Sequence, residues 1–324
     1  MFERAQTLFL YALSPVHFGA GSSVGPVDSP IQREKHTGWP KANSTSLRGP
    51  IRRALVGKDE WENEKIEQAF GPEAGGGELY QAAVGIGDAM LLLFPIRAAR
   101  HAFVYATCPA VLAALWRRLT EITGEAANTT LEIPVLPVSG PPRGQCWTLP
   151  NGAHKSGNLL LEAFLFPADE QASMSALAQW AKWIAEHAFP TSSDYFKKKL
   201  TQDLVLLHDD DFGYFARRST IVEAHNRIDD AAGTVEQGGL FYIEHLPPES
   251  LLASWVDASS TKAPKKEGAA DHPNADGWLG MVSKTLDGQT LQAGGDATTG
   301  RGLLHSRFLK PTQPLKIQQL GGGE

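Results

Sequence analysis

Hydrophobic residues follow two patterns along this chain: nearly continuous apolar runs, and runs with helical spacing. Nearly continuous runs predict buried strands, at 6–14, 84–96, 100–108, 158–166 and 302–309. Helical spacing predicts a helix that starts behind the capping candidates at 43–46 and continues to 57, and further helices at 59–71, 109–123 and 169–189. Pro109 and Gly124 are typical residues for the start and the end of the third helix.

The order of these elements indicates an α+β fold. Strands and helices alternate irregularly and are separated by long loops, which does not suit a doubly wound parallel sheet. A loop rich in Gly, Ser and Pro covers 15–40, and turn residues near Gly233 predict a hairpin over 223–242. The small, polar and charged residues of 257–276 predict a flexible insertion. We expect one domain with insertions over 1–324.

Composition indicates an ordinary cytoplasmic protein. Cys108 and Cys146 lie far apart and form no metal or disulfide framework, so we expect a reduced setting. The apolar runs "TLFLYAL" and "AMLLLFPI" are too short for a signal peptide or a membrane span. We predict no targeting segment and no membrane contact.

Charge is unevenly distributed. The 324 residues carry a formal net charge of −6, which argues mildly against nucleic acid. The window from Arg33 to Lys58 holds seven Lys or Arg and one acidic residue, so it carries +6 and leaves −12 for the rest. A basic segment on an acidic body is typical of a localised polyanion site. A solvated charged face is the alternative interpretation.

The glycine-rich stretch "LQAGGDATTGRGLL" at 291–304 invites four interpretations. A dinucleotide fingerprint fails because the spacing is wrong and a strand follows. A phosphate-binding P-loop fails because Arg301-Gly302 stands where Lys-Ser/Thr is needed, and too little chain follows for a nucleotide-binding domain. Two interpretations remain. One is a tight turn before an edge strand, and the other is a loop whose backbone N–H groups meet an extended phosphodiester chain.

A run of three acids, Asp209–Asp211, resembles a metal cluster at first sight. Consecutive residues do not share a face in a helix or in a strand. We therefore interpret the run as a solvated turn.

Several stretches together resemble a known family. "GGDATTGRGLL" near the C-terminus resembles the glycine-rich loop of the RAMP superfamily. "VHFGAGSSVGPVDSPIQREKHTGWPKANSTSLRGPIRRAL" resembles the N-terminal block of the repeated backbone subunit of type III CRISPR RNA-guided effectors, and "RRSTIVEAHNRIDDAAGTVEQGGLFYIEHLPP" follows in the family's order. "VYATCP" and "GGLFYIEHLPP" favour the type III-B (Cmr) complex over its III-A (Csm) relative.

The resemblance implies an RRM-like, ferredoxin-like core with a Gly-rich loop, inserted helices and a projecting thumb hairpin. It implies a filament of identical subunits along a guide crRNA, which binds complementary target RNA together with other type III-B subunits. The hairpin would wedge into the guide–target duplex, with Arg227, Ile228 and Val235 as contact candidates. The guide-binding candidates are Arg33, Lys35, Ser46, Arg48, Gly49, Arg52, Gly294, Gly295, Thr298, Gly300, Arg301 and Gly302.

The resemblance also places the family's catalytic aspartate at Asp28, within a catalytic loop at 15–40. Considered alone, an Asp between two prolines is an Asx-turn former. A carboxylate at this position can hold a divalent cation, Mg²⁺ or Mn²⁺, that helps the 2′-OH of RNA to attack its own phosphate. His17 is a candidate for proton transfer or phosphate contact, with a structural loop histidine as the alternative. Glu244 and His245 match positions near the family's active site.

Three functions compete at this point. The first is an RNA-guided endoribonuclease subunit that is active within an assembly. The second is a scaffold that binds crRNA without cutting, which would have no need of Asp28. The third is a repeat-processing endoribonuclease, which the predicted thumb and the type III N-terminal block oppose.

Overall fold

A large mixed sheet organises the protein, which was analysed as a computed structural model that describes residues 2–72, 79–123, 133–136, 139–150, 152, 157–169, 174–229, 231–264 and 272–309. Its first half contains, in spatial order, β13 (Thr290–Gln292), β14 (Leu303–Phe308), β1 (Arg4–Ala12), β12 (Leu251–Ala258) and β4 (Ala89–Ala98). All neighbours in this half are antiparallel. Two short strands join its side, β2 (Lys41–Ala42) on β4 and β3 (Val84–Ile86) on β12.

The sheet continues into a second half. Its strands follow β4 in the order β5 (Ala102–Thr107), β9 (Leu204–Leu207), β6 (Cys146–Thr148), β8 (Phe164–Asp169) and β7 (Asn158–Leu161). Here β5 and β9 are parallel, as are β6 and β8. The mixture of parallel and antiparallel pairs agrees with the predicted α+β class.

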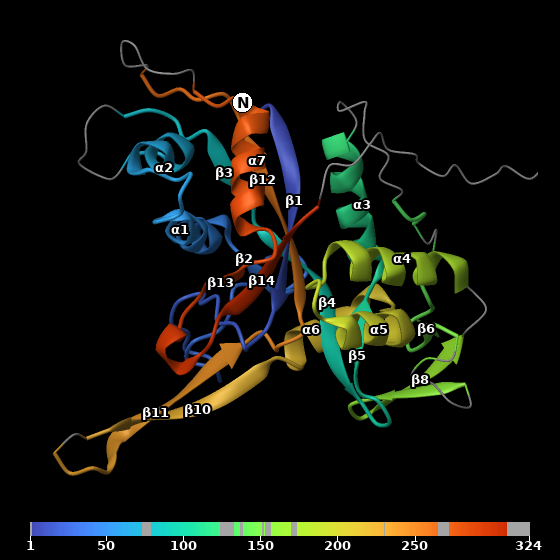
Figure 1. Ribbon diagram of the computed structural model, residues 1–324. Coiled ribbons are helices and arrows are strands. Elements are labelled where there is room, and N and C mark those ends of the chain that lie inside the picture. The colour runs from blue at the N-terminus through green and yellow to red at the C-terminus, as the bar shows by residue number, and fades with distance from the viewer. Residues whose placement is uncertain are drawn as a thin grey trace, which may run out of the picture.

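Helices cover the sheet in two groups (Figure 1). One group contains α1 (Ser44–Leu55), α2 (Asn63–Phe70) and α7 (Ala275–Leu286). The other contains α3 (Pro109–Thr123), α4 (Met174–His187), α5 (Asp194–Asp203) and α6 (Asp209–Arg218). Among the described helices, none is long and apolar enough to cross a membrane.

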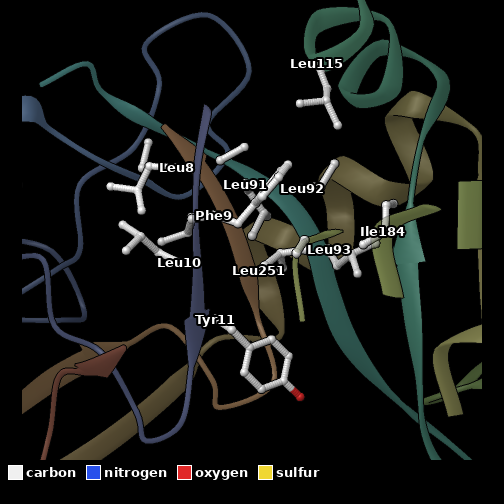
Figure 2. Packing of buried hydrophobic residues seen from close by; sticks show 14 of the residues in the cluster. Leu8, Phe9, Leu10, Tyr11, Leu91, Leu92, Leu93, Leu115, Ile184 and Leu251 are labelled. Atoms are coloured by element: carbon white, nitrogen blue, oxygen red, sulfur yellow. The ribbon is translucent and has the colours of Figure 1, made fainter. Parts of the chain in front are cut away.

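The core lies along β1, β12 and β4, whose side chains are buried on both faces (Figure 2). Leu8 and Phe9 point to opposite sides of β1, and both are fully buried. A strand that is covered on both faces carries apolar residues at every position instead of at alternate ones, which explains the continuous run in the sequence. Each fully buried Leu or Phe contributes roughly 1.5–3 kcal/mol.

Two sequence interpretations are wrong. The apolar run at 158–166 is two strands, β7 and β8, because the chain turns at Glu162, which adopts a positive φ of 51° without any glycine or proline to mark the turn. Asp209–Asp211 is the first turn of α6, where negative charge interacts favourably with the helix dipole. Two of these carboxylates also accept backbone hydrogen bonds, Asp209 from Ala110 and Asp211 from Gly144.

A separate two-stranded sheet projects from the body (Figure 1). It is a hairpin of β10 (Ile221–Ile228) and β11 (Val235–His245), longer at both ends than the predicted 223–242. Its turn is closed by two backbone hydrogen bonds, from Asp229 N–H to the carbonyl of Thr234 and from Gly233 N–H to the carbonyl of Asp229, and Gly233 adopts a positive φ of 62°. We call this element the hairpin, and its end at Ile221 and His245 the hairpin base.

The predicted insertion at 257–276 overlaps ordered elements at both ends. Residues 257–258 belong to β12 and 275–276 to α7, while 265–271 lie outside the described residues. Helix α7 itself was not predicted, although Trp278, Leu279, Val282 and Leu286 have helical spacing and are buried behind the cap Asn274.

Candidate functional site

The predicted catalytic loop runs beside the hairpin base. Ser29 forms a parallel bridge with Ile243, and Val16 forms an antiparallel bridge with Leu246. Ser29 donates its N–H to the carbonyl of Tyr242 at 3.1 Å and accepts one from Glu244 at 3.0 Å. The loop therefore follows the outer edge of β11 like a short extra strand, and residues 28–31 take their register from the hairpin.

Asp28 is exposed and is held at one oxygen. Its Oδ2 accepts a hydrogen bond from the backbone N–H of Tyr242 at 2.7 Å. Within the described residues, its Oδ1 accepts no hydrogen bond. The Asx turn considered as an alternative is not the bond that this side chain makes, because the residue two positions on is Pro30, which has no N–H to donate. The carboxylate is thus fixed in orientation and open on one side.

His17 lies behind this loop and is nearly buried, with 8% exposure. Its Nδ1 lies 2.7 Å from the carbonyl oxygen of Glu244, and its Nε2 lies 3.3 Å from the hydroxyl of Ser29. Ser29, which follows Asp28 in the chain, therefore contacts the imidazole of His17. Sequence reasoning placed Asp28 and His17 in one loop but did not identify Ser29 as the residue between them.

His245 is completely buried beside His17. Its Nε2 lies 3.5 Å from Oδ2 of Asp296 in the Gly-rich loop. Burial lowers the pKa of His245, and the nearby His17 and Arg301 act in the same direction, while Glu223 and Asp296 oppose them. The side chain is enclosed between the catalytic loop, the hairpin base and the Gly-rich loop.

Glu244 is buried and occupied on both oxygens. Oε2 accepts the backbone N–H of Ile31 at 3.0 Å, and Oε1 accepts the Thr220 hydroxyl at 2.6 Å and pairs with Arg33. Arg33 in turn donates to the carbonyls of Gly38 and Ala216. These two predicted site residues thus hold the loop to the hairpin base and to α6.

The Gly-rich loop, residues 293–302, packs against the catalytic loop. Gly295 donates its N–H to the carbonyl of His17, and Gly302 donates to that of Pro15, both at 2.8 Å. A Cβ on Gly294 would lie 2.6 Å from the carbonyl oxygen of His17, and one on Gly302 would overlap the carbonyl of Ala293. These glycines are required by the protein's own backbone, a contact that the sequence did not predict.

The remaining loop candidates face solvent. Gly300 has a φ of 79° and open space where a Cβ would stand, and Thr298 is exposed beside it. Arg301 forms an ion pair with Glu223 of β10, a residue that sequence reasoning missed because it is far away in the chain.

The basic candidates gather around α1. Lys35 is exposed, and Arg48 donates to the carbonyl of Phe70 at the end of α2. The hydroxyl of Ser46 accepts a hydrogen bond from Gln32 at 2.9 Å. A groove of about 460 Å³ between α1 and α2 is lined by Gly49, Arg52, Arg53, Val56, Asn63, Ile66 and Glu67.

The hairpin end carries exposed apolar side chains. Ile228 and Val235 face each other across the two strands and are 51% and 53% exposed. Arg227 lies 3.5 Å from Glu236 in an exposed pair. Such side chains gain nothing from the protein's own core, so they are available for contacts outside this chain.

Known proteins identify the class to which this arrangement belongs. The family model of the RAMP superfamily matches residues 9–305, and the chain belongs to this superfamily. In sequence, the chain is 31% identical over 303 residues to the CRISPR system Cmr endoribonuclease Cmr4 of Pyrococcus furiosus, which covers 93% of this chain and 94% of that protein. The resemblance that the motifs carried is confirmed.

Solved structures agree. The crystal structure of oligomeric Cmr4 from Pyrococcus furiosus superposes with a TM-score of 0.66 at 26% identity, over 94% of this chain and 98% of that one. A chain in the cryo-EM structure of the type III-B Cmr-beta complex bound to cognate target RNA gives 0.68 at 18% identity, over 95% and 98%. At that identity the likeness shows the fold alone.

Proposed function

We propose that this protein is the repeated backbone subunit of a type III-B CRISPR effector. It binds guide crRNA along the complex, beside further copies of itself and other type III-B subunits, and cleaves complementary target RNA at regular intervals. The similarity to a Cmr endoribonuclease, which extends over nearly the whole length of both chains, supports the activity. The related Cmr4 crystal structure is that of an oligomer, which supports self-association.

One observation carries the assignment of catalysis to Asp28. The hydrogen bond from Tyr242 N–H to Oδ2 fixes the carboxylate at the surface, and Oδ1 has no partner among the described residues. Glu244, by contrast, engages both of its oxygens within the protein. A fixed, half-open carboxylate is suited to act on a group that arrives from outside, and the hairpin is the element that orients it.

The proposed reaction is attack of the target's own 2′-OH on the adjacent phosphate. The hydroxyl gives up its proton, the bond from phosphorus to the 5′ oxygen breaks, and the products are a 2′,3′-cyclic phosphate and a 5′-hydroxyl, which takes up a proton. The negative charge of Asp28 favours deprotonation of the attacking hydroxyl. His17, whose Nε2 lies 3.3 Å from the Ser29 hydroxyl, is the proposed group for proton transfer. Both roles come from side chains of the catalytic loop at 15–40.

A divalent cation, Mg²⁺ or Mn²⁺, fits this site in a limited sense. The described residues contain no group of three or more His, Cys, Asp or Glu that would hold a metal by themselves. A hard cation is often held by one carboxylate together with water and substrate phosphate, and Asp28 offers that carboxylate. Such a cation, when bound, would activate the 2′-OH and neutralise phosphate charge.

The guide-binding surface that we propose extends from α1 to the exposed part of the Gly-rich loop. Arg48 and Arg52 on α1 supply positive charge, and the open position at Gly300 admits an RNA backbone without a side chain in the way. The hairpin is the proposed thumb. Its exposed Ile228 and Val235 would replace base stacking with apolar contact where a base pair is displaced.

We also propose that the core is RRM-like. The strands β14, β1, β12 and β4 lie side by side in that order and are antiparallel throughout. Helix α1 lies between β1 and β4 in the chain, and α7 lies between β12 and β14. Two βαβ units that interleave in this way are the arrangement of a ferredoxin-like core, and the second half of the sheet is an insertion between β4 and β12.

Substitution of Asp28 by Asn tests the proposal. An Asn can still accept the N–H of Tyr242, so the loop, guide binding and target binding are expected to survive, while cleavage falls at least ~100-fold, the scale of one catalytic group. A target with a single 2′-deoxy nucleotide should resist cutting at that site alone. Cutting at the deoxy site would show that another nucleophile attacks.

The second candidate is a scaffold that binds crRNA without cutting. One observation favours it: both oxygens of Glu244, a predicted catalytic residue, are occupied by hydrogen bonds within the protein. The same variant separates the two. If Asp28→Asn cleaves target RNA as well as the parent protein, Asp28 is not the catalytic residue and the scaffold role is favoured. Failure of Asp28→Asn to assemble would make Asp28 a residue that forms the loop.

A further inference from the structure

Tyr242 lies on β11 near the hairpin base, and its backbone N–H orients the carboxylate of Asp28 at 2.7 Å. Its side chain takes no part in that bond. The side chain is 38% exposed, and within the described residues its hydroxyl makes no hydrogen bond and its ring meets no other aromatic ring. A large side chain without a polar or aromatic partner in this part of the chain therefore stands beside the proposed catalytic carboxylate.

Covalent geometry limits the distance between these two side chains. The Cβ of any residue lies about 2.5 Å from its own backbone nitrogen, so the Cβ of Tyr242 lies within about 5 Å of Oδ2 of Asp28. The register agrees. Ser29 forms a parallel bridge with Ile243, which places Asp28 opposite Tyr242, and Tyr242 pairs with Ala224 on β10. Asp28, Tyr242 and Ala224 thus form one row, in which Tyr242 is the only large side chain.

This row belongs to the exposed face of the hairpin. Because side chains alternate along a strand, Val222 and Leu240 stand on the same face as Tyr242. They are 48% and 51% exposed. The opposite face is turned to the Gly-rich loop, where Glu223 pairs with Arg301. We call the face with Val222, Leu240 and Tyr242 the open face.

The composition of the open face suits a nucleobase better than a phosphate. Among residues 222–226 and 240–244, none of those on the open face is a lysine or an arginine. An aromatic ring stacks on the flat face of any base, and apolar neighbours exclude water from such a stack. In RNA the base and the 2′-OH are attached to adjacent carbons of one ribose. A nucleotide whose 2′-OH reaches Asp28 therefore brings its own base within reach of Tyr242.

We infer that the ring of Tyr242 stacks on the base of the target nucleotide whose 2′-OH attacks. The stack holds the ribose so that its 2′-OH stays at the open side of the Asp28 carboxylate. The inference rests on the proposed function, because it needs a target strand that reaches Asp28. The ring enters no bond-making step, so Tyr242 is a positioning residue, and the proton transfers of the proposed reaction are unchanged.

Single-turnover cleavage at saturating target, by the complex assembled on guide RNA, tests the role of the ring. Tyr242→Ala should slow cleavage by about 10-fold, the scale of one lost base–aromatic stack. Tyr242→Phe should cleave like the parent protein, because the ring remains. Tyr195→Ala, which removes another exposed tyrosine ring on α5, is the matched control and should also cleave normally. An equal loss in Tyr242→Phe and Tyr242→Ala would overturn the inference, since the hydroxyl would then be responsible.

A modified target separates stacking from a structural effect on Asp28. At one cut site the target carries a ribose with hydrogen in place of the base, which keeps the 2′-OH and the phosphate. The parent protein should cut this site about 10-fold more slowly than the intact site, and Tyr242→Ala should cause no further loss there. If Tyr242→Ala slows both sites by the same factor, the substitution acts through the backbone that holds Asp28, and the inference is wrong.

The same variants keep the inference apart from the proposed function. Normal cleavage by Tyr242→Ala, with loss in Asp28→Asn, overturns the inference and leaves the proposed function in place. Normal cleavage by Asp28→Asn overturns the proposed catalysis, while the comparison of the two target sites still decides whether the ring stacks. Should Tyr242→Ala not fold, Tyr242→Leu, which keeps an apolar side chain without a ring, takes its place.

Another protein chain is the alternative occupant of the open face. If Tyr242→Ala hinders association of the subunits on guide RNA, measured by light scattering without target, a neighbouring chain covers the ring and the inference is overturned. We expect the same assembly as in the parent protein, and an unchanged thermal midpoint, because the ring is exposed.

Discussion

The imidazoles of His17 and His245 meet edge to face, with ring centroids 5.6 Å apart and planes inclined by 60°. One ring belongs to the loop at 15–40 and the other to the end of β11, while the Gly-rich loop covers both. Three segments that are far apart in the chain therefore meet at two buried histidines. Any change that moves one of these segments is transmitted to the backbone beside Asp28.

The glycines of the Gly-rich loop should not be equivalent. Gly300→Ala should lower the free energy of unfolding by about 1–2 kcal/mol. A Cβ has open space there, so the cost comes only from the left-handed backbone conformation. Gly294→Ala should cost more and should also reduce cleavage, since a Cβ there displaces the carbonyl of His17. Urea unfolding and target cleavage measure the two effects. Equal costs at both positions would show that the contact with His17 yields easily.

Acid should destabilise the fold through histidines that are wholly or partly buried. Burial lowers the pKa of His187, His245 and His305, so the unfolded chain binds protons more readily than the folded one. The contribution of these histidines to the free energy of unfolding is complete above pH 6.5. It is lost as the pH falls from 6.5 through their pKa values in the folded protein. The free energy of unfolding in urea should decrease between pH 7 and pH 5.5.

Two variants test this assignment. His245→Gln should make the dependence on pH shallower, and an unchanged slope would argue against His245. Glu249 acts in the opposite sense, because burial raises its pKa to about 7 and its contribution is lost as the pH rises from 4.5 towards 7. Relative to the parent protein, Glu249→Gln should therefore be more stable at pH 8 than at pH 5.

Guide binding should depend on α1 without regard to sequence. Arg48→Ala with Arg52→Ala removes contacts to phosphates, so affinity should fall equally for unrelated guides. The slope of log affinity against log salt should flatten by about 0.7 for each lost contact. The control is Arg100→Ala with Arg117→Ala, which removes two exposed charges, one in the turn between β4 and β5 and one on α3. A loss that varied with guide sequence would contradict phosphate contact.

The hairpin end should matter for cleavage and not for folding. Deletion of 229–236 removes a turn whose backbone hydrogen bonds stay within the hairpin, and Gly238 and Gly239 can form a new turn. Thermal stability should be unchanged, while target cleavage should fall because the nucleotide at the cut is no longer displaced. Leu165→Ser, at an exposed apolar position on β8, is the control. Full cleavage after the deletion would exclude a wedge.

Local signals in the sequence predicted those elements that depend on local chemistry. The helix from Pro109 and the last strand were found because a proline, a glycine or a continuous apolar run marks them. The turn at Glu162 was missed because its positive φ is imposed by the pairing of β7 with β8 and not by the residue type. Tertiary pairing decided that turn.

The site was predictable to a different extent. Asp28 and His17 were proposed from a motif, yet no spacing in the sequence indicates that Tyr242 orients Asp28 or that Glu223 holds Arg301. These contacts connect residues that are far apart in the chain. The sequence also could not explain why residue 294 is a glycine. The group that a Cβ there would meet is the backbone carbonyl of His17, and every residue type has a backbone carbonyl.

The pairing of β1 with β14 sets the order in which the protein can be completed. Leu8 is opposite Phe308 in this ladder, so nearly the whole chain must leave the ribosome before the two strands can meet. Contacts between distant segments form slowly and late, because closing a long loop costs entropy before any contact is made. The Gly-rich loop directly precedes β14 and is anchored by it. A nascent chain therefore cannot hold the Gly-rich loop in its final position until β14 has paired with β1.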